Sequence, residues 1–463
     1  MAKVSGEYLP LSVLGEFPSD WNESTLEEVC HQVTDGTHDS PKPVAEGGYP
    51  LVTGKAIKDR RVDFSVTYNI SDAEHQKVIE RSKPERDDIL FANIGNSIGD
   101  LVRVQTDRPF SIKNVALFKP NPSKVSARYL EYFLLSEQVQ GFIKGSTRGS
   151  AQPFIGLGSL RGFPVPLPPM NEQLSIGALL GALDDRITLL RETNATLEAI
   201  AQALFKSWFV DFDPVRAKAE GRQPEGMDAA TAALFPDSFE ESELGLVPKG
   251  WGIKSVAEVA EVVKGKSYTS KELAEQHDTA LVTLKSFARG GGFRLDGFKP
   301  YTGSYKPAQV VVPGDLIIAY TDVTQAAELI GKPAIVIGVE DYQTLVASLD
   351  VGIVRPDIQK VSRQYLYGLF RTESFQSHTF AHTSGTTVLH LAKDGVGSYQ
   401  FSCPPNEIIQ SFSVITDALS ERCQNNIDQV RNLTQLRDTL LPRLISGQLR
   451  LPEAEALMAE VAS

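Results

Sequence analysis

Apolar residues recur along two stretches of the chain with the alternating four- and three-residue spacing of a coiled-coil seam. One asparagine interrupts each seam, Asn194 in the first stretch and Asn426 in the second. The seam positions are Ile176, Leu180, Leu183, Ile187, Leu190, Asn194, Leu197, Ala201 and Leu204, and then Phe412, Thr416, Leu419, Cys423, Asn426, Val430, Leu433, Arg437 and Leu440. The spacing predicts two long helices, which most simply pair as an antiparallel coiled coil. The alternative is that each helix lies separately on a globular core.

Short apolar runs bounded by turn residues occupy much of the remaining chain. The runs at 88–92 and 315–319 predict strands, whereas 124–135 and 360–370 predict short helices. Aromatic residues gather where the first long helix ends, at Trp208, Phe209 and Phe212. They predict either a small core of their own or a surface on which another protein docks.

The two halves of the chain repeat one another. Trp21 closes a segment that resembles the segment closed by Trp251, at a shift of 230 positions, and Lys55 meets Lys285 at the same shift. Further along, Pro168 and Pro169 meet the second proline pair at 404–405, at a shift of 236. The order of the matches and their near-constant shift predict a tandem duplication, in which each copy is a mixed helix–strand module followed by one long helix.

These patterns divide the chain into seven segments. They are an N-terminal segment (1–19), a first module (20–168), a first long helix (169–210), a linker (211–247), a second module (248–403), a second long helix (404–447) and a C-terminal tail (448–463). The linker is rich in proline, glycine and acidic residues, and we expect it to contain one short helix near 228–234.

The acidic charge of the chain is unevenly distributed. The 463 residues carry a formal net charge of −12, and the linker alone has nine acidic residues against three basic ones. Residues 20–169 have 18 Lys and Arg against 19 Asp and Glu, and residues 248–404 have 16 against 15. The two modules are therefore close to neutral, which argues against indiscriminate coating of nucleic acid but leaves room for local DNA-binding faces.

Cysteine usage and hydropathy indicate the cellular compartment. Cys30, Cys403 and Cys423 lie far apart and form neither a paired motif nor a zinc-ligand spacing, so a reducing compartment is expected. The first residues lack the apolar core of a signal peptide, and the most apolar stretches are too short to cross a membrane. We expect a cytoplasmic protein.

Motifs for catalysis are weak. A glycine–lysine–serine string begins at Gly265, but the first glycine of a phosphate-binding loop is replaced by Ala260. His378 and His382 lie four residues apart with His390 nearby, without Cys or carboxylate neighbours at ligand spacing. The string 403–406 has the double proline of an adenine methyltransferase loop but the wrong residue at either end. The sequence therefore favours a protein without a catalytic or metal site of its own.

Several segments together resemble the specificity (S) subunit of type I restriction–modification enzymes, over nearly the whole chain. The segments that carry the resemblance are 14–21 and 244–251, Thr34-Asp35-Gly36-Thr37-His38, 149–155, the double-proline segment 166–173 with the helix end at 204–209, and 440–449. The resemblance implies an α+β fold with two α/β target-recognition domains in tandem repeat, separated by two long helices that form an antiparallel coiled coil.

The resemblance also implies a function. Each recognition domain reads one half of a bipartite, asymmetric site in double-stranded DNA, and the helices set the half-site spacing and dock two modification (methyltransferase) subunits. Restriction subunits, which carry the motor and nuclease, join through the modification subunits. No cofactor and no catalysis is expected on this chain, because S-adenosylmethionine, ATP and Mg²⁺ belong to the partners. An orphan or inhibitory S-like DNA-binding protein and a scaffold without a DNA role remain alternatives.

Loop residues with hydrogen-bonding or charged side chains are the candidates for DNA contact, because such groups hold phosphates or read base edges. The candidates in the first module are Asp35, Thr37, His38, Lys55, Lys58, Arg60, Arg61, Asn93, Asn96, Arg148, Ser150 and Gln152. Those in the second are Lys264, Lys266, Tyr268, Lys285, Arg289, Thr321, Asp322, Thr324, Gln325, Thr383, Ser384 and Thr387.

The candidates divide by expected role. Lys55 and Lys285 match between the copies and are assigned to phosphate, whereas the residues that differ are assigned to bases. The base-reading pairs are Asn96 with Gln152, and Asp322 with Gln325. Glycines in these loops, such as Gly36, are expected to let the backbone approach the duplex. The alternative for each residue taken alone is that it is part of a solvated loop.

Overall fold

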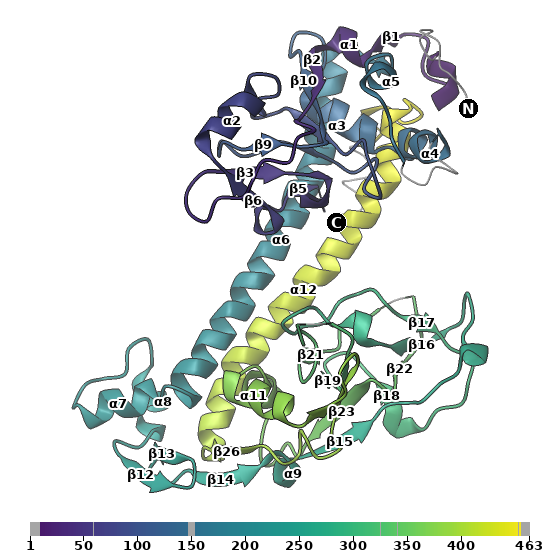
Figure 1. Ribbon diagram of the computed structural model, residues 1–463. Coiled ribbons are helices and arrows are strands. Elements are labelled where there is room, and N and C mark those ends of the chain that lie inside the picture. The colour runs from purple at the N-terminus through teal and green to yellow at the C-terminus, as the bar shows by residue number, and fades with distance from the viewer. Residues whose placement is uncertain are drawn as a thin grey trace. The chain divides into compact units, whose positions relative to one another are not determined.

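The computed structural model describes residues 10–58, 60–146, 153–324, 326–339, 341–451 and 453–454. The chain forms two compact units, here called unit 1 (Met1–Leu190 with Gln429–Ser463) and unit 2 (Arg191–Asp428). Two 40-residue helices, α6 (Met170–Phe209) and α12 (Asn406–Ile445), contribute one half each to both units (Figure 1). The two predicted long helices are therefore present. The boundaries between the two units fall inside these helices. The division of the chain into separate modules and helices stays a prediction.

Unit 1 is built on a four-stranded antiparallel sheet in the order β2-β10-β7-β8. Its strands are β2 (Cys30–Asp35), β10 (Ala116–Pro120), β7 (Ile89–Phe91) and β8 (Leu101–Arg103). A second sheet, β6-β3-β9, has strands β6 (Tyr68–Ile70), β3 (Tyr49–Val52) and β9 (Ser111–Ile112), with β3 and β9 parallel. Smaller pairs are β1 (Asn22–Thr25) with β11 (Pro164–Leu167), and β4 (Ile57–Lys58) with β5 (Arg61–Val62). The helices are α1 (Leu26–Val29), α2 (Asp72–Ile79), α3 (Ala127–Leu135), α4 (Glu137–Ser146) and α5 (Leu157–Arg161), with the 3-10 turns η1 (Leu11–Leu14), η2 (Gly54–Ala56) and η3 (Phe64–Val66).

Unit 2 repeats this plan in its main sheet and adds strands around it. Its main sheet has the order β15-β23-β19-β21, from β15 (Ala260–Lys264), β23 (Val351–Pro356), β19 (Leu316–Ala319) and β21 (Pro333–Ile335). The second sheet joins β17 (Lys299–Pro300), β16 (Thr279–Val282), β22 (Thr344–Ala347) and β18 (Val310–Val311), and its β16–β22 pair is parallel like β3–β9. The remaining strands are β14 (Gly252–Ser255) with β26 (Gln400–Cys403), and β20 (Thr321–Asp322), β25 (Leu389–Leu391) and β24 (Thr383–Ser384). The helices are α9 (Val256–Val259), α10 (Arg363–Phe370) and α11 (Glu373–Ala381), with η4 (Ser270–Glu272), η5 (Leu284–Ser286) and η6 (Pro307–Gln309). The predicted duplication is thus evident in the fold.

The inner strands β7 and β19 of the main sheets are buried on both faces, which explains why they are apolar throughout. In β7, Ile89 and Phe91 face the cluster that contains α3, α6 and α12 residues, whereas Leu90 between them faces the second sheet. In β19, Leu316 and Ile318 likewise belong to one cluster, whereas Ile317 belongs to the other. Successive strand residues point to opposite faces, so a strand covered on both sides must be apolar throughout.

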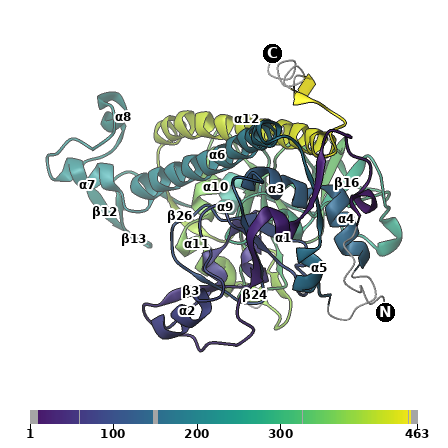
Figure 2. The same cartoon turned by 90° about the horizontal axis from the view of Figure 1, so that it is seen from above.

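The long helices pair antiparallel within unit 2, as Figures 1 and 2 also show. Asn426 donates a 2.7 Å hydrogen bond from Nδ2 to Oδ1 of Asn194, and Asn194 donates to the Cys423 carbonyl at 3.1 Å. Further along, the rings of Phe205 and Phe412 lie 5.8 Å apart. Contacts therefore move towards lower numbers on α12 as they move towards higher numbers on α6. The two asparagines predicted to interrupt the seams are each other's partners.

The linker is more structured than its composition indicated. It contains α7 (Asp213–Ala219), α8 (Ala229–Leu234) and the hairpin β12 (Phe239–Ser242) with β13 (Gly245–Pro248). Val215 and Phe235 are buried in the unit 2 core. The short helix expected near 228–234 is confirmed as α8, whereas α7 and the β12–β13 hairpin were not predicted, because isolated apolar residues such as Val215 and Phe235 give little periodic signal.

The aromatic residues at the end of α6 belong to the core. Trp208 and Phe209 are buried against Phe412, with ring centroids 6.0 and 5.1 Å away, and Phe212 meets Trp251 edge to face at 5.6 Å. Of the two predictions for this cluster, the core is the one that the structure supports.

Candidate nucleic-acid interface

Two equivalent loops follow the first strand of each main sheet. Gly36 after β2 donates its N–H to the Val115 carbonyl, and Gly265 after β15 donates to the Val351 carbonyl, both at 3.0 Å. A Cβ at Gly36 would lie 2.1 Å from the Ile112 carbonyl oxygen, and one at Gly265 would lie 2.0 Å from that of Ser348. These glycines admit the chain's own backbone, so the expectation that they serve approach to the duplex is corrected.

In unit 1 this first loop is held by charge. Asp35 is buried and pairs with Arg81 and, at 3.1 Å, with His38, whose other ring nitrogen lies 2.9 Å from Asn114 Oδ1. Thr37 is half-buried, forms a backbone bridge with residue 113 and accepts a hydrogen bond from residue 39. Asp35 is withdrawn as a DNA-contact candidate because its carboxylate is buried and paired, whereas the His38 side chain is 57% exposed. Arg81 and Asn114 join this loop from distant segments, and no local pattern marks them.

The matched lysines occupy equivalent places. Lys55 lies in η2, directly after β3, and Lys285 lies in η5, directly after β16. Both side chains are exposed. Their assignment to phosphate stays a prediction, and their exposure is compatible with it.

The hairpin β4–β5 contains three basic candidates with different surroundings. Lys58 and Arg61 form a register pair beside the turn and are exposed. Arg60, in the turn, points the other way and binds Glu131 and Asp184. Arg60 is corrected from a DNA contact to an internal ion-pair partner, because its guanidinium is already neutralised by two carboxylates.

The loops after β7 and β19 are likewise stabilised by hydrogen bonds between buried side chains and the backbone. Asn93 is buried and donates to the Ile155 carbonyl at 3.0 Å, whereas Asn96 is exposed. Thr321 and Asp322 are buried in β20. They and Asn93 are therefore withdrawn as DNA contacts.

Asp322 organises the loop that follows it. Its carboxylate accepts backbone N–H groups from Thr324 and Leu329 at 2.6 Å and from Ile330 at 2.9 Å. Burial opposes ionisation, yet the hydrogen bonds from these groups hold the pKa of Asp322 below its ordinary value. The half-buried Thr324 hydroxyl accepts the N–H of Glu328, so this loop is built around its own polar groups.

The other candidates of unit 2 are mostly accessible. Lys264 is exposed at the end of β15, Lys266 is half-buried beside Ser348, and the hydroxyl of Tyr268 accepts a 2.8 Å hydrogen bond from Lys299. Arg289 is exposed and pairs with Glu328 at 3.3 Å. Thr383 is half-buried in β24, and Ser384 and Thr387 are exposed. Four further candidates, Arg148, Ser150, Gln152 and Gln325, lie outside the described residues.

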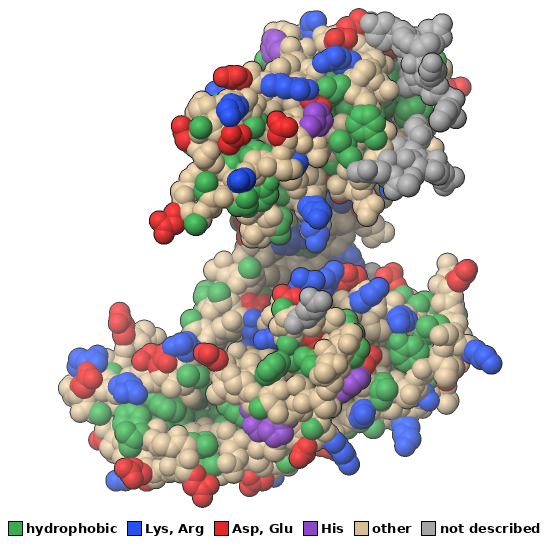
Figure 3. Space-filling view, viewed as in Figure 1, with side chains coloured by type: hydrophobic (Ala, Val, Ile, Leu, Met, Phe, Trp, Pro, Cys, Tyr) green, Lys and Arg blue, Asp and Glu red, His purple; other side chains and the backbone are tan. Residues whose placement is uncertain are grey.

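The exposed candidates thus form a smaller set than the sequence indicated. They are His38, Lys55, Lys58, Arg61 and Asn96 in unit 1, and Lys264, Lys285, Arg289, Ser384 and Thr387 in unit 2. Basic side chains are interspersed with acidic ones over the visible face of each unit (Figure 3). This agrees with the near-neutral charge of the modules, and it favours contact through individual loops over a continuous basic surface.

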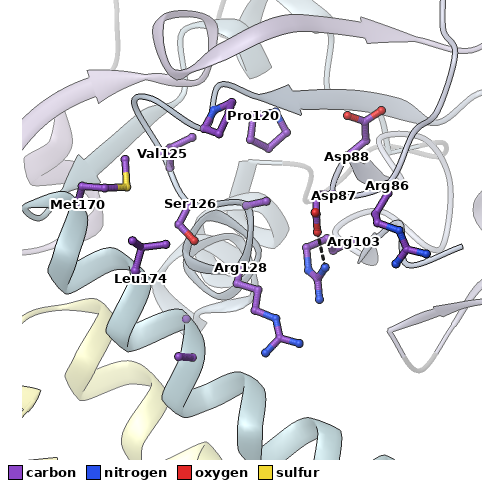
Figure 4. A pocket seen from close by; sticks show the side chains of 14 residues that line it. Arg86, Asp87, Asp88, Arg103, Pro120, Val125, Ser126, Arg128, Met170 and Leu174 are labelled. Carbon is purple, nitrogen blue, oxygen red and sulfur yellow. Dashed lines mark hydrogen bonds and ion pairs between the residues drawn. The ribbon is translucent and has the colours of Figure 1, made fainter. Parts of the chain in front are cut away.

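A pocket of about 650 Å³ opens in unit 1 beside the start of α6 (Figure 4). Met170 and Leu174 of α6 line one side, Pro120 and Val125 another, and the Arg128 side chain reaches along it. None of the DNA-contact candidates lines this pocket. It is a feature of the junction between module and helix and is separate from the candidate interface.

Among the residues that the structure describes, no group of three or more His, Cys, Asp or Glu side chains could hold a metal ion. His378 and His382 stack on each other with ring centroids 4.1 Å apart. Within the same residues, no helix combines the length and the apolar character needed to cross a membrane.

Comparison with known proteins agrees with the resemblance seen in the motifs. Residues 18–199 match the family model of the type I restriction modification DNA specificity domain. The type I restriction enzyme HindI specificity subunit of Haemophilus influenzae is 24% identical over 490 residues, which cover 93% of this chain and all of that protein. The MjaIX specificity subunit of Methanocaldococcus jannaschii is 23% identical over 450 residues, covering 95% and 96%. The crystal structure of the type I restriction-modification system S subunit from M. genitalium matches with a TM-score of 0.55 at 14% identity, over 94% of this chain and 98% of that one.

The solved S subunit from M. genitalium shares the fold of a duplicated module with two long helices, and the predicted fold class is confirmed. Residues 18–199 thus resemble the type I restriction modification DNA specificity domain, and nearly the whole chain is similar to type I restriction enzyme specificity subunits.

Proposed function

We propose that the chain reads a bipartite, asymmetric sequence in double-stranded DNA. The module at 20–168 reads one half-site and the module at 248–403 reads the other. The helices at 169–210 and 404–447 set the distance between the half-sites and dock two modification subunits, through which restriction subunits join. S-adenosylmethionine, ATP and Mg²⁺ are bound by those partner subunits and not by this chain.

The observation that carries this proposal is a shared framework with different side chains at equivalent places. The loop after the first strand has buried Asp35 before Gly36 in one module and exposed Lys264 before Gly265 in the other. The hairpin beyond the matched lysine is charged in unit 1, whereas its counterpart contains the run Gly290–Gly292. Base edges are distinguished by the donors and acceptors of side chains, so two such modules would read two different half-sites.

The near-neutral modules bear on affinity. The electrostatic part of DNA binding grows with the number of phosphates that basic groups neutralise. Modules without basic excess would hold DNA weakly alone, and the modification subunits would supply much of the grip. We therefore expect tight, sequence-specific binding only for the assembled complex.

Exchange of one module tests the reading role. Residues 248–403 are replaced by the corresponding module of a relative, and methylated bases are mapped across the genome in cells that carry the modification subunits. One half of the methylated site should change while the other half stays. A change in both halves, or in neither, would contradict the proposal.

Lengthening the helices tests the spacing role. One heptad is inserted after Asn194 and another immediately before Asn426, because these residues are hydrogen-bonded partners and the insertions then face each other. Seven residues lengthen a helix by about 10 Å, so the unread spacer should grow by at most about three base pairs while both half-sites persist. An unchanged spacer would count against the helices as the ruler.

A further inference from the structure

A buried cluster of charges joins the β4–β5 hairpin to the long helices within unit 1. Arg60 in the hairpin turn donates from Nη2 to Glu131 of α3 at 3.0 Å and from Nη1 to Asp184 of α6. The guanidinium carbon lies 4.8 Å from the centre of the Tyr132 ring. Asp184 also accepts hydrogen bonds from Tyr132 and, at 2.7 Å, from Arg437 of α12. One side chain of the hairpin thus binds α3 and α6, and the carboxylate that it binds on α6 is shared with Arg437 of α12.

The cluster is shielded from solvent and nearly balanced in charge. The Glu131 side chain is 3% exposed, Asp184 18% and Arg60 26%. Arg103 of β8 completes the shell around Glu131 with a 3.1 Å contact. Burial opposes charge on Asp184, but Arg60, Tyr132 and Arg437 hold its pKa below the ordinary value. Glu131 and Asp184 each have Arg60 and one further cation as partners, so removing Arg60 takes away part of the charge compensation of both buried carboxylates.

The backbone of the hairpin is adapted to this contact. Arg60 has a φ of 58°, in the left-handed region that non-glycine residues seldom adopt. The flanking pair Lys58 and Arg61 lie opposite each other in register, so their side chains occupy the same face of the hairpin. Both are exposed, whereas Arg60 is directed into the unit. Turning Arg60 inward therefore fixes where Lys58 and Arg61 are presented.

The equivalent hairpin of unit 2 is held differently. A single bridge joins Phe287 to Phe293, and Gly290, Gly291 and Gly292 between them all have positive φ. Arg289 beside these glycines pairs with Glu328 at the surface, where the two side chains are 74% and 36% exposed. The inward arginine is thus a feature of the first module. The second module has an equivalent framework but keeps its hairpin arginine, Arg289, at the surface.

We propose that Arg60 is a positioning residue for DNA reading by the first module: it fixes the β4–β5 hairpin on α3 and α6, so that Lys58 and Arg61 meet the DNA in one geometry. This inference rests on the proposed function. A positioning role differs from a direct DNA contact because a positioning role of Arg60 also requires its partner Asp184. Asp184 lies on α6, 124 positions away in the sequence.

The test uses the full chain assembled with its modification subunits. Binding is measured by fluorescence anisotropy on duplexes with the intact site, with the first half-site altered and with the second half-site altered. The variants are Arg60→Leu, Asp184→Asn and the double variant. Arg86→Leu is the matched control, because it removes the same charge from the same module at an exposed pair with Asp107. Amide hydrogen exchange of 56–63 is followed in the same proteins without DNA.

Arg60→Leu and Asp184→Asn should each lower discrimination at the first half-site on the order of tenfold, the size of one well-formed base contact. Discrimination at the second half-site should persist, the double variant should resemble the single ones, and exchange at 56–63 should quicken. Arg86→Leu should change none of these. Should Arg60→Leu fail to fold, Asp184→Asn carries the test, because it keeps the shape of the side chain.

Unchanged discrimination in a folded Asp184→Asn complex would overturn the inference, as would an equal loss at both half-sites. A loss with Arg60→Leu alone would make Arg60 a direct contact and would also overturn it. A wild-type complex that discriminates at neither half-site would instead overturn the proposed function and, with it, the role given to Arg60. The hydrogen-exchange result decides separately whether Asp184 anchors the hairpin.

Discussion

Replacement of Asn194 by leucine perturbs the meeting point of the long helices in unit 2. Asn426 is fully buried, and its side-chain N–H group is satisfied by Asn194 Oδ1 at 2.7 Å. Asn194→Leu removes that acceptor and also the donor to the Cys423 carbonyl. A buried polar group left without its partner costs about 1–3 kcal/mol. For a unit of 238 residues, Arg191–Asp428, this lowers the melting temperature by roughly 2–4 °C per kcal/mol.

The double variant Asn194→Leu/Asn426→Leu should behave differently from the sum of its parts. When both polar partners give way to apolar side chains, the cost is close to zero or the change is stabilising. The two single losses should therefore not add, and the cycle should give a coupling of about 1–3 kcal/mol.

Urea unfolding followed by circular dichroism, with the four proteins of the cycle, measures these free energies. Asn425→Leu is the matched control, since Asn425 is the neighbouring asparagine on α12 and is exposed, and its change should stay within about 0.5 kcal/mol. Strict additivity of the two seam substitutions would refute the reasoning, because it would mean that Asn194 and Asn426 do not depend on each other.

Three further substitutions test single contacts. Asp322→Asn should lower the free energy of unfolding by about 2 kcal/mol at pH 7. Because the pKa of Asp322 is lowered in the folded protein, the extra stability of the wild type should be present above the ordinary carboxyl pKa of about 3.9 and shrink as the pH falls below it. A stability difference independent of pH would contradict this. Gly265→Ala should destabilise by about 1–3 kcal/mol, since its Cβ would meet the Ser348 carbonyl; thermal melting should show no comparable loss for Gly252→Ala, where nothing lies within 4 Å. Phe205→Ala should cost about 3–5 kcal/mol, as a fully packed core aromatic, and a cost no larger than that of exposed Ile200→Ala in the same denaturation assay would argue against the core assignment.

Some corrections to the predicted interface share one cause. Lys58, Arg60 and Arg61 are alike in the sequence, three basic residues in one charged loop. Only the fold brings Asp184 to the second of them and leaves the other two exposed. Asp322 was similarly expected to read bases, although its oxygens are used by backbone N–H groups as far as eight residues away. The side chain alone cannot reveal such use, because a carboxylate binds a backbone amide and a base amine through the same acceptor.

The sequence by itself determined the duplication, the two long helices and their polar interruptions, because periodic spacing records which face of an element is buried. It also marked Lys55 and Lys285 as equivalent. The tertiary structure decided that Asn194 meets Asn426, that the acidic linker helps to close the unit 2 core, and that Arg60 turns inward. The physical reason is the sequence separation of the interacting residues. Helix and strand patterns depend on residues close together in the sequence, whereas the partner of a charge or an amide comes from a distant segment that only folding brings near.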